Sequence, residues 1–241
     1  MPAEHIMKSY DEELSRLNKM IVEMGGLAES QLAAAIEAVA KRDSALAARV
    51  VEGDAQVDEL ERELDNLAIR LLALRQPMAR DLREIFAALK IGSDLERICD
   101  YAANVAKRSI ALSQTPPIQP VHALPRMATL ALGQVKDIID AYIERDADKA
   151  LEVWRRDEEL DEMYSSLFRE FLTYMMEDPR NIGACTHLLF MAKNIERIGD
   201  HATNIAENLY YLVHGKALTE VRPKGDNSSL EVVAPDRAGS R

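Results

Sequence analysis

Apolar residues recur every three or four positions through most of this chain, in six blocks separated by short breaks. That spacing puts the apolar side chains on one face of an α-helix, so each block predicts a helix with a buried face. The predicted helices span about residues 10–40, 44–74, 82–112, 124–143, 147–176 and 182–212. Residues that start or stop helices occupy the breaks, among them Asp43, Pro77, Asp146 and Pro179. The pattern therefore predicts an all-α protein.

The second half of the chain repeats the first. Residues 94–106 read Asp-Leu-Glu-Arg-Ile-Cys-Asp-Tyr-Ala-Ala-Asn-Val-Ala, and residues 194–206 read Asn-Ile-Glu-Arg-Ile-Gly-Asp-His-Ala-Thr-Asn-Ile-Ala. Residues 24–43 likewise align without gaps on residues 127–146. Each repeat thus supplies three of the six helices. Long helices joined by short turns predict two tandem, pseudo-symmetric bundles of three up-down antiparallel helices.

Composition shifts mark the domain boundaries. Residues 1–113 are predicted to form the first three-helix bundle and residues 126–216 the second. Between them, residues 114–125 contain four prolines and no periodicity, which is typical of a linker. Residues 217–241 are polar and rich in Gly, Pro and Ser, so this tail is predicted to be disordered.

The charge balance limits the classes of partner. Thirty basic and forty-one acidic residues give a net charge of −11, which disfavours direct binding to nucleic acid or to an anionic lipid surface. No apolar stretch approaches the roughly 20 residues that span a bilayer, so direct membrane insertion is not expected. Cys99 and Cys185 lack the spacing of a disulfide or metal motif. These features favour a cytoplasmic protein.

Acidic rows lie at the border of several apolar faces. Glu96, Asp100 and Asn104 follow one another at four-residue intervals, and the second repeat preserves this spacing. On a helix they form one polar stripe that rises about 6 Å per step. The preceding predicted helix carries Asp54 and Asp58 at the edge of its own apolar face. Rows at these edges are placed to meet across a helix–helix groove.

The position of the turns predicts which carboxylates meet. If the second and third helices of a repeat reverse at the proline between them, residues equally far before and after the turn lie level. The carboxylates predicted to converge are Asp54, Asp58, Glu96 and Asp100 in the first repeat, and Asp157, Asp161, Glu196 and Asp200 in the second.

Like charges in such a groove repel one another, so protons, arginines or cations must neutralise them. An oxygen-rich ligand set suits Mg²⁺, Ca²⁺, Mn²⁺ or iron better than zinc. The first groove also carries Glu61 and Asp65, which Tyr164 and Phe168 replace in the second repeat. The second groove is therefore predicted to be poorer in oxygen ligands, and His201 and Asn204 can also distinguish it.

A simpler interpretation stays open. Acidic residues at four-residue spacing are common on solvated helix faces, where Arg62, Arg97 and Arg197 are placed to form ordinary ion pairs. The arginine-rich segment 75–83 exceeds what a turn needs, and can serve either an acidic partner or the end of a helix. A purely structural helical scaffold would need no metal at all.

Catalytic motifs are sparse. None of the five histidines has a glutamate three positions before it, which argues against a di-iron helical bundle. Residues 24–27, Met-Gly-Gly-Leu, lie inside a helical pattern and favour close helix packing or a bend over a phosphate loop. A metal-dependent hydrolase that uses carboxylate-bound cations remains the alternative function.

The duplicated Leu-Glu-Arg-Ile-x-Asp-x-Ala-x-Asn-x-Ala element resembles the PhoU family, as do Arg75-Gln76-Pro77 and the segment 173–179. The resemblance extends over about residues 20–215. It implies no enzymatic activity and a cytoplasmic negative regulator of phosphate uptake and of the phosphate-starvation response. Such a regulator is expected to form a homodimer and to connect a high-affinity phosphate ABC transporter with a sensor histidine kinase. The resemblance also implies metal clusters at the eight carboxylates named above, with iron, zinc, magnesium or manganese all compatible.

Overall fold

A computed structural model describes residues 2–75, 77–116, 124–220 and 222, with side chains from residue 10 onward. Over these residues the chain forms six α-helices and no strand, so the all-α prediction is confirmed. The helices are α1 (Pro2–Lys41), α2 (Ser44–Arg75), α3 (Ala79–Ser113), α4 (Leu124–Glu144), α5 (Ala147–Glu177) and α6 (Ile182–His214). A short 3-10 helix, η2 (Pro179–Asn181), joins α5 to α6.

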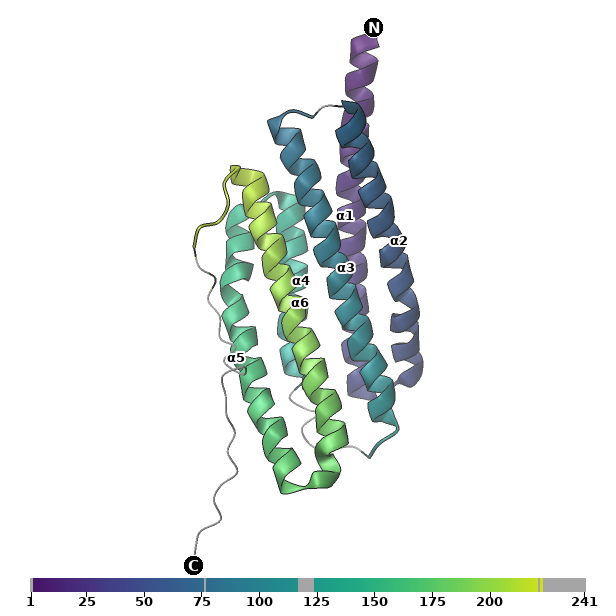
Figure 1. The fold of residues 1–241 in the computed structure, drawn as a ribbon, viewed down its shortest axis with the longest axis vertical. Coiled ribbons are helices and arrows are strands. Elements are labelled where there is room, and N and C mark those ends of the chain that lie inside the picture. Colours follow the sequence, from purple (N-terminus) through teal and green to yellow (C-terminus); the bar gives the residue numbers. More distant parts are fainter. Residues whose placement is uncertain (1, 76, 117–123, 221, 223–241) are drawn as a thin grey trace, which may run out of the picture.

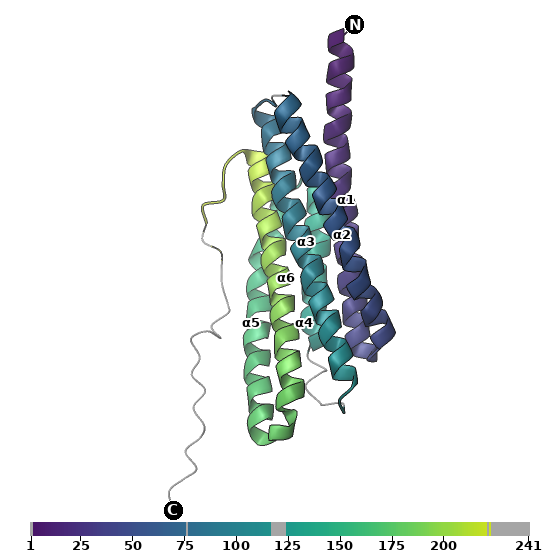
Figure 2. The ribbon, with the colours of Figure 1, turned by 45° about the vertical axis from the view of Figure 1, so that its right-hand side comes forward.

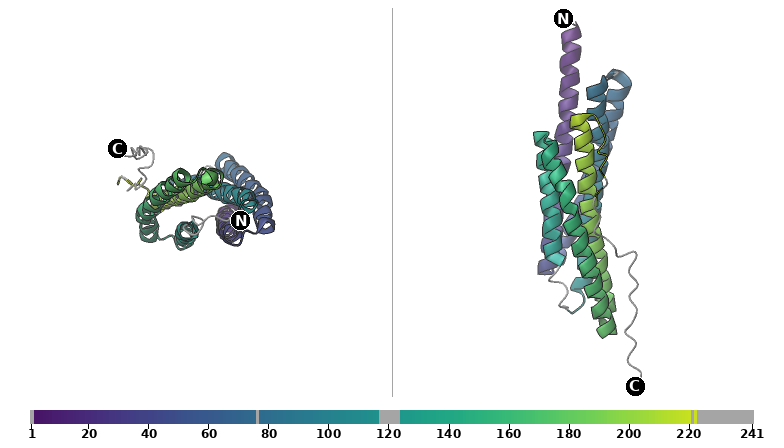
Figure 3. Two further views of the ribbon diagram at one scale, coloured as in Figure 1. Left: turned by 90° about the horizontal axis from the view of Figure 1, so that it is seen from below. Right: turned by 90° about the vertical axis from the view of Figure 1, so that its left-hand side faces the viewer.

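The helices form two three-helix bundles that lie side by side (Figure 1). Helices α1, α2 and α3 make the first bundle and α4, α5 and α6 the second. The bundles meet where α3 packs against α6 and where α1 packs against α4. Seen along the long axis, α2 and α5 lie at the two outer ends of the array (Figure 3). Helix α3, which carries Glu96 and Asp100, therefore contacts both α2 and the other bundle. Helix α6, which carries Glu196 and Asp200, likewise contacts both α5 and the other bundle.

Buried apolar side chains from all six helices form one continuous core. Gly25 permits the close approach of α1 to α4, since a Cβ atom there would lie 2.6 Å from Cδ1 of Ile139. Gly26, by contrast, faces open space. The prediction of close helix packing at this glycine pair is therefore confirmed for Gly25. In Figure 2, α1 runs beyond the other helices at its N-terminal end.

Equivalent turns connect the first two helices of each repeat. Asp43 and Asp146 each accept hydrogen bonds from two backbone N–H groups at the start of the next helix. The residue before each aspartate is an arginine in the left-handed region, with φ of 53° at Arg42 and 57° at Arg145. Because residues with a Cβ atom rarely adopt this region, the backbone at both arginines carries some conformational cost.

Two predicted boundaries need adjustment. Helix α4 begins at Leu124, inside the predicted linker, because Leu124 is buried and a proline is tolerated in the first helical turn. Within the predicted tail, Leu218 packs against the core and Arg222 contacts two carboxylates. The rest of the predicted disorder, at residues 221 and 223–241, lies outside the described residues, as does most of the linker.

The two cysteines, Cys99 and Cys185, are buried and free. Burial, reinforced by the carboxylates of Asp54 and Glu96, raises the pKa of the Cys99 thiol. This thiol is therefore held in its unreactive protonated form. In the part of the chain that the structure describes, no helix combines the length and the apolar character required to cross a bilayer.

Candidate functional site

The α2–α3 groove brings together the four carboxylates predicted for the first repeat. Burial raises the pKa of Asp54, and the nearby carboxylates of Asp100 and Asp58 raise it further. Burial raises the pKa of Glu96 to about 7, with further contributions from Asp100 and Glu61. These mutual effects show that side chains from both helices share one electrostatic environment. We call this set of Asp54, Asp58, Glu96 and Asp100 the first acidic groove.

Basic side chains compensate the first acidic groove only in part. Arg97 lies 3.3 Å from Asp100 and 3.7 Å from Glu96, but its side chain is largely exposed. Arg62 forms an exposed surface ion pair with Glu59 at 2.7 Å, of the kind that the simpler interpretation predicts. The pKa of Glu61 is raised by burial and by a further carboxylate, Asp65. The groove therefore retains an excess of negative charge when its carboxylates are ionised.

The α5–α6 groove holds the matching carboxylates of the second repeat, Asp157, Asp161, Glu196 and Asp200, and we call it the second acidic groove. Three of them are deeply buried, with exposed fractions of 0% for Asp157, 3% for Asp161 and 5% for Glu196. Burial raises the pKa of Asp157 to about 6, and Asp161 and Asp200 act in the same direction. Burial also raises the pKa of Glu196 to about 7. This groove is drier than the first.

The chain supplies its own cations to the second acidic groove. The Arg222 guanidinium contacts the Asp157 carboxylate and lies 2.6 Å from Oδ1 of Asp200. Lys193 Nζ lies 2.7 Å from Oε1 of Glu196. Sequence reasoning missed Arg222 because it falls in a polar tail without periodicity. The two grooves thus differ in compensation as well as in composition.

Several buried oxygens in the second acidic groove lack a hydrogen-bond partner. They are Oδ1 of Asp157, Oε2 of Glu196 and Oε1 of Gln134. Gly199 allows this crowding, since a Cβ atom there would lie 2.7 Å from Asp157 Oδ1 and 2.4 Å from Cδ2 of Leu160. Buried acceptors without donors are unfavourable, and a cation or an ordered water would satisfy them. Carboxylate and amide oxygens are the ligands that hard cations prefer.

A complete ligand set is not preformed. Among the residues that the structure describes, no three carboxylate, histidine or cysteine side chains converge in the geometry of a metal site. In the second acidic groove Arg222 already contacts Asp157 and Asp200, so a cation there would compete with its guanidinium. The residues fit a cation by charge and by unsatisfied oxygens, while their present orientations do not yet surround one.

The repeat itself identifies the family. A PhoU domain matches residues 21–109 and again residues 124–209. The chain therefore belongs to the PhoU family. Each match covers one bundle, with α1–α3 in the first and α4–α6 in the second.

Relatives match over nearly the whole chain. The phosphate-specific transport system accessory protein PhoU homologue of Caulobacter vibrioides is 54% identical over 224 residues, which cover 92% of this chain and 97% of that protein. The corresponding protein of Rhizobium meliloti is 52% identical over 226 residues, covering 93% of this chain and 95% of that protein. The similarity therefore spans nearly the full length of both relatives.

Crystal structures of PhoU proteins share the fold. PhoU from Pseudomonas aeruginosa matches with a TM-score of 0.84 and 40% identity, covering 86% of this chain and 100% of that chain. The phosphate transport system regulatory protein PhoU from Streptococcus pneumoniae matches with a TM-score of 0.81 and 29% identity, covering 88% of this chain and 100% of that chain. The tandem arrangement of two PhoU bundles is confirmed.

One expectation about the second PhoU repeat is wrong. His201 and Asn204 do not face the second acidic groove, because both turn toward the other bundle and hydrogen-bond to Asp94 of α3. The His201 ring also lies 5.6 Å from the ring of Tyr101, its equivalent in the first PhoU repeat. The equivalent residues of the two repeats therefore meet at the α3–α6 contact. Asp94 is the first residue of the duplicated motif, and its place in that motif was the only indication in the sequence that it has a specific partner.

Proposed function

We propose that this protein regulates phosphate homeostasis in the cytoplasm. In this role it restrains phosphate uptake and the phosphate-starvation response by linking the high-affinity phosphate ABC transporter to a sensor histidine kinase. The observation that carries the proposal is the 54% identity, over 92% of the chain, with an accessory protein of the phosphate-specific transport system. The relatives bear names of accessory or regulatory proteins, which also supports a role without catalysis.

A deletion strain tests the regulatory role. Removal of the gene is expected to switch on a phosphate-starvation reporter in phosphate-rich medium, and a plasmid copy is expected to switch it off again. Purified transporter ATPase and kinase domain are each expected to retain the full chain in a co-purification assay. A reporter that stays silent in the deletion strain would contradict the proposal.

Exposed apolar residues near the turn between α2 and α3 support the binding of a protein partner. Met78, Leu82 and Phe86 are 80%, 46% and 47% exposed where α3 begins. Large apolar side chains in water favour association. We propose that this surface contributes to contacts with the transporter, because the relatives are named as accessory proteins of the phosphate-specific transport system. Leu82→Asp with Phe86→Asp should weaken co-purification with the transporter ATPase, whereas Val22→Asp, at another exposed apolar position, should not.

We further propose that both acidic grooves bind divalent or trivalent metal ions. The buried oxygens without partners and the raised pKa values of Glu96 and Glu196 support this. A bound ion would neutralise the carboxylates and hold the helix pairs together. Iron, zinc, magnesium and manganese are to be compared, with thermal unfolding in each metal and in a chelator as the measurement. A melting temperature that no metal raises would count against these sites.

A further inference from the structure

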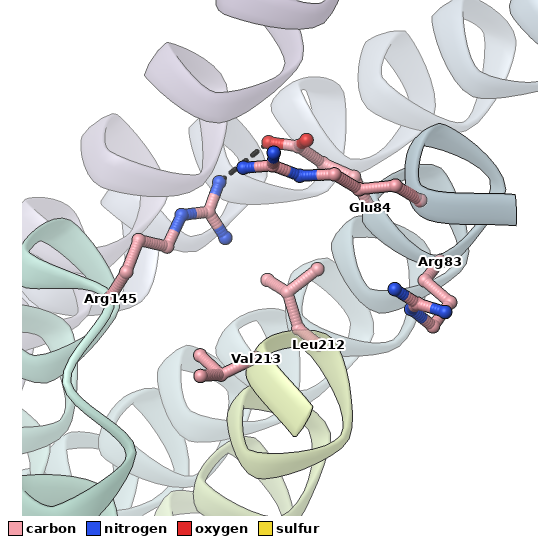
Figure 4. Close-up of a pocket in the computed structure, with 6 residues that line it drawn as sticks. Arg83, Glu84, Arg145, Leu212 and Val213 are labelled. Carbon is pink, nitrogen blue, oxygen red and sulfur yellow. Dashed lines mark hydrogen bonds and ion pairs between the residues drawn. The ribbon is translucent and has the colours of Figure 1, made fainter. Parts of the chain in front are cut away.

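A cavity of about 370 Å³ lies at the end of the molecule where α3 begins and where α4 and α6 end. Its lining comes from both repeats: Arg80, Arg83, Glu84, Arg145, Leu212 and Val213. Figure 4 shows Arg83 and Arg145 on opposite sides of Leu212, with Glu84 paired to Arg145. We call this cavity the arginine pocket. Its volume falls within the range of about 300–1,000 Å³ that is usual for small-molecule sites.

The arginine pocket carries a surplus of positive charge. Its single carboxylate, Glu84, accepts a hydrogen bond from Arg145 Nη2 at 2.6 Å and another from Asn18 at 2.7 Å. Glu84 therefore neutralises one guanidinium. Among the described residues, neither Arg80 nor Arg83 has an ion-pair or hydrogen-bond partner, so two positive charges in the lining remain uncompensated.

Two nitrogens of the pocket arginines are buried without a hydrogen-bond acceptor. They are Nε of Arg83 and Nη1 of Arg145. The Arg83 guanidinium rests on Gly215, because a Cβ atom at that residue would lie 3.2 Å from Nη1 of Arg83. Gly215 has a φ of 69°, a conformation that favours glycine, so the end of α6 leaves room for the arginine. Buried donors without acceptors in a native protein call for a ligand or water.

The other end of the molecule shows that the arginine pocket is a departure from the repeat symmetry. There Arg42, the counterpart of Arg145, donates from Nη2 to the carbonyl oxygens of Leu112 and Thr115 at the end of α3. Arg145 does not satisfy the end of α6 in this way, since it turns to Glu84 and Asn18. The counterpart of Arg83 is a glycine, Gly183. Of these two ends, the one where α6 ends is therefore the one at which guanidinium groups without ion pairs, those of Arg80 and Arg83, surround a cavity.

We propose that the arginine pocket binds a small ligand with two or more phosphate groups. Guanidinium groups match phosphate oxygens in charge and in hydrogen-bond geometry, and two donors already lack acceptors. Guanidinium groups on separate walls fit anionic groups that are spaced apart better than they fit one small ion. The apolar side chains of Leu212 and Val213 can contact the less polar part of the ligand. This inference stands on the pocket alone and does not depend on metal binding in the acidic grooves.

Calorimetric titration of the full chain tests the proposal, with diphosphate as the probe. The buffer contains EDTA, which removes metal-bridged phosphate, and about 0.15 M salt, which screens weak surface attraction. Orthophosphate and citrate are titrated in parallel. Diphosphate is expected to bind at least about tenfold more tightly than either, because it bridges more than one guanidinium group.

Two variants locate the site. Arg83→Gln should weaken diphosphate binding by about tenfold or more, which is the loss of one charge-assisted hydrogen bond. Val213→Glu, at a residue that is 40% exposed, should place a carboxylate in the pocket and abolish binding without disturbing the core. Arg180→Gln is the matched control, since Arg180 aligns with Arg80 but pairs with Asp178 on the surface.

Each of the following results would overturn the proposal. These are the absence of diphosphate binding at millimolar concentration, equal binding by both pocket variants and wild type, and citrate binding as tight as diphosphate binding. Orthophosphate binding as tight as that of diphosphate would refute the requirement for two phosphate groups. Tight diphosphate binding that both pocket variants lose and Arg180→Gln retains would support the proposal.

Discussion

Arg222 lies 2.6 Å from Asp200, so a residue beyond the last helix occupies the second acidic groove with a positive charge. The same guanidinium contacts Asp157, which is fully buried. A guanidinium between these carboxylates neutralises them as a cation would, and it competes with a metal ion for the same oxygens. In the first acidic groove, the largely exposed Arg97 pairs with Asp100, and Lys107 offsets only part of the effect that burial and Asp100 have on the pKa of Asp54.

Replacement of Arg222 by alanine is expected to tighten metal binding at the second acidic groove by about tenfold or more, because the competing charge is removed. In a chelator the same variant should be less stable, since Asp157 loses its partner. Titration with Mn²⁺, followed by electron paramagnetic resonance, measures the affinity. Arg62→Ala, which removes an exposed arginine paired with Glu59, is the control and should change neither quantity.

The metal-free protein is expected to lose stability as the pH rises from about 4.5 to about 7. Glu96 and Glu196 have pKa values raised from 4.5 to about 7, mainly by burial, so the folded state binds more protons than the unfolded state in this window. The free energy of unfolding therefore falls with pH. The free energy of unfolding is expected to fall by at most about 3 kcal/mol per glutamate across this window. Urea unfolding at pH 5 and pH 7.5 in EDTA checks this, and Glu96→Gln should flatten the dependence.

A methyl group at residue 199 should destabilise the second bundle. In Gly199→Ala the new Cβ would meet Leu160 at 2.4 Å and Asp157 at 2.7 Å, so the neighbouring side chains must shift. The expected loss is about 1–3 kcal/mol in the free energy of unfolding. Gly26→Ala serves as the control, because nothing lies within 4 Å of its Cβ and helix propensity favours alanine. Equal stability of the two variants would contradict the packing described for α5 and α6.

The hydrogen bond between His201 and Asp94 should couple the two bundles. Its Nδ1–Oδ1 distance is 2.8 Å and it joins α6 to α3. A double-mutant cycle with His201→Ala and Asp94→Ala is expected to give a coupling of about 0.5–3 kcal/mol in unfolding experiments. The exposed pair Arg16 and Glu63, 3.7 Å apart, should give less than about 0.5 kcal/mol. A coupling no larger than that of this surface pair would exclude a role for the contact in joining the bundles.

The helices and the facing of the acidic rows could be predicted from the sequence, because both depend on short-range periodicity and on the position of a turn. Helix α2 ends at Arg75 and α3 begins at Ala79, on either side of the predicted reversal at Pro77. Level residues on the two helices follow from this geometry. Helix α4 begins at Leu124, as the periodicity predicts, although the domain division assigns Leu124 and Pro125 to the linker.

Other features of the grooves could not be predicted. A helical wheel gives the direction of His201 but not the identity of the helix it faces, and α3 of the other bundle lies there. Arg222 follows a segment without periodicity, so nothing in the sequence connects it with Asp157. The arginine pocket likewise depends on which acceptors Arg145 finds in space. Long-range pairing of polar side chains carries no local signal.

We propose that the two acidic grooves are unequal cation sites. Elemental analysis of natively purified protein, beside Glu96→Gln with Asp100→Asn and beside Glu196→Gln with Asp200→Asn, tests it most directly. We predict that wild type retains metal, that the first-groove variant loses the larger share, and that the second-groove variant loses the smaller share because Arg222 already compensates that groove. Equal metal content in all three proteins would contradict the claim.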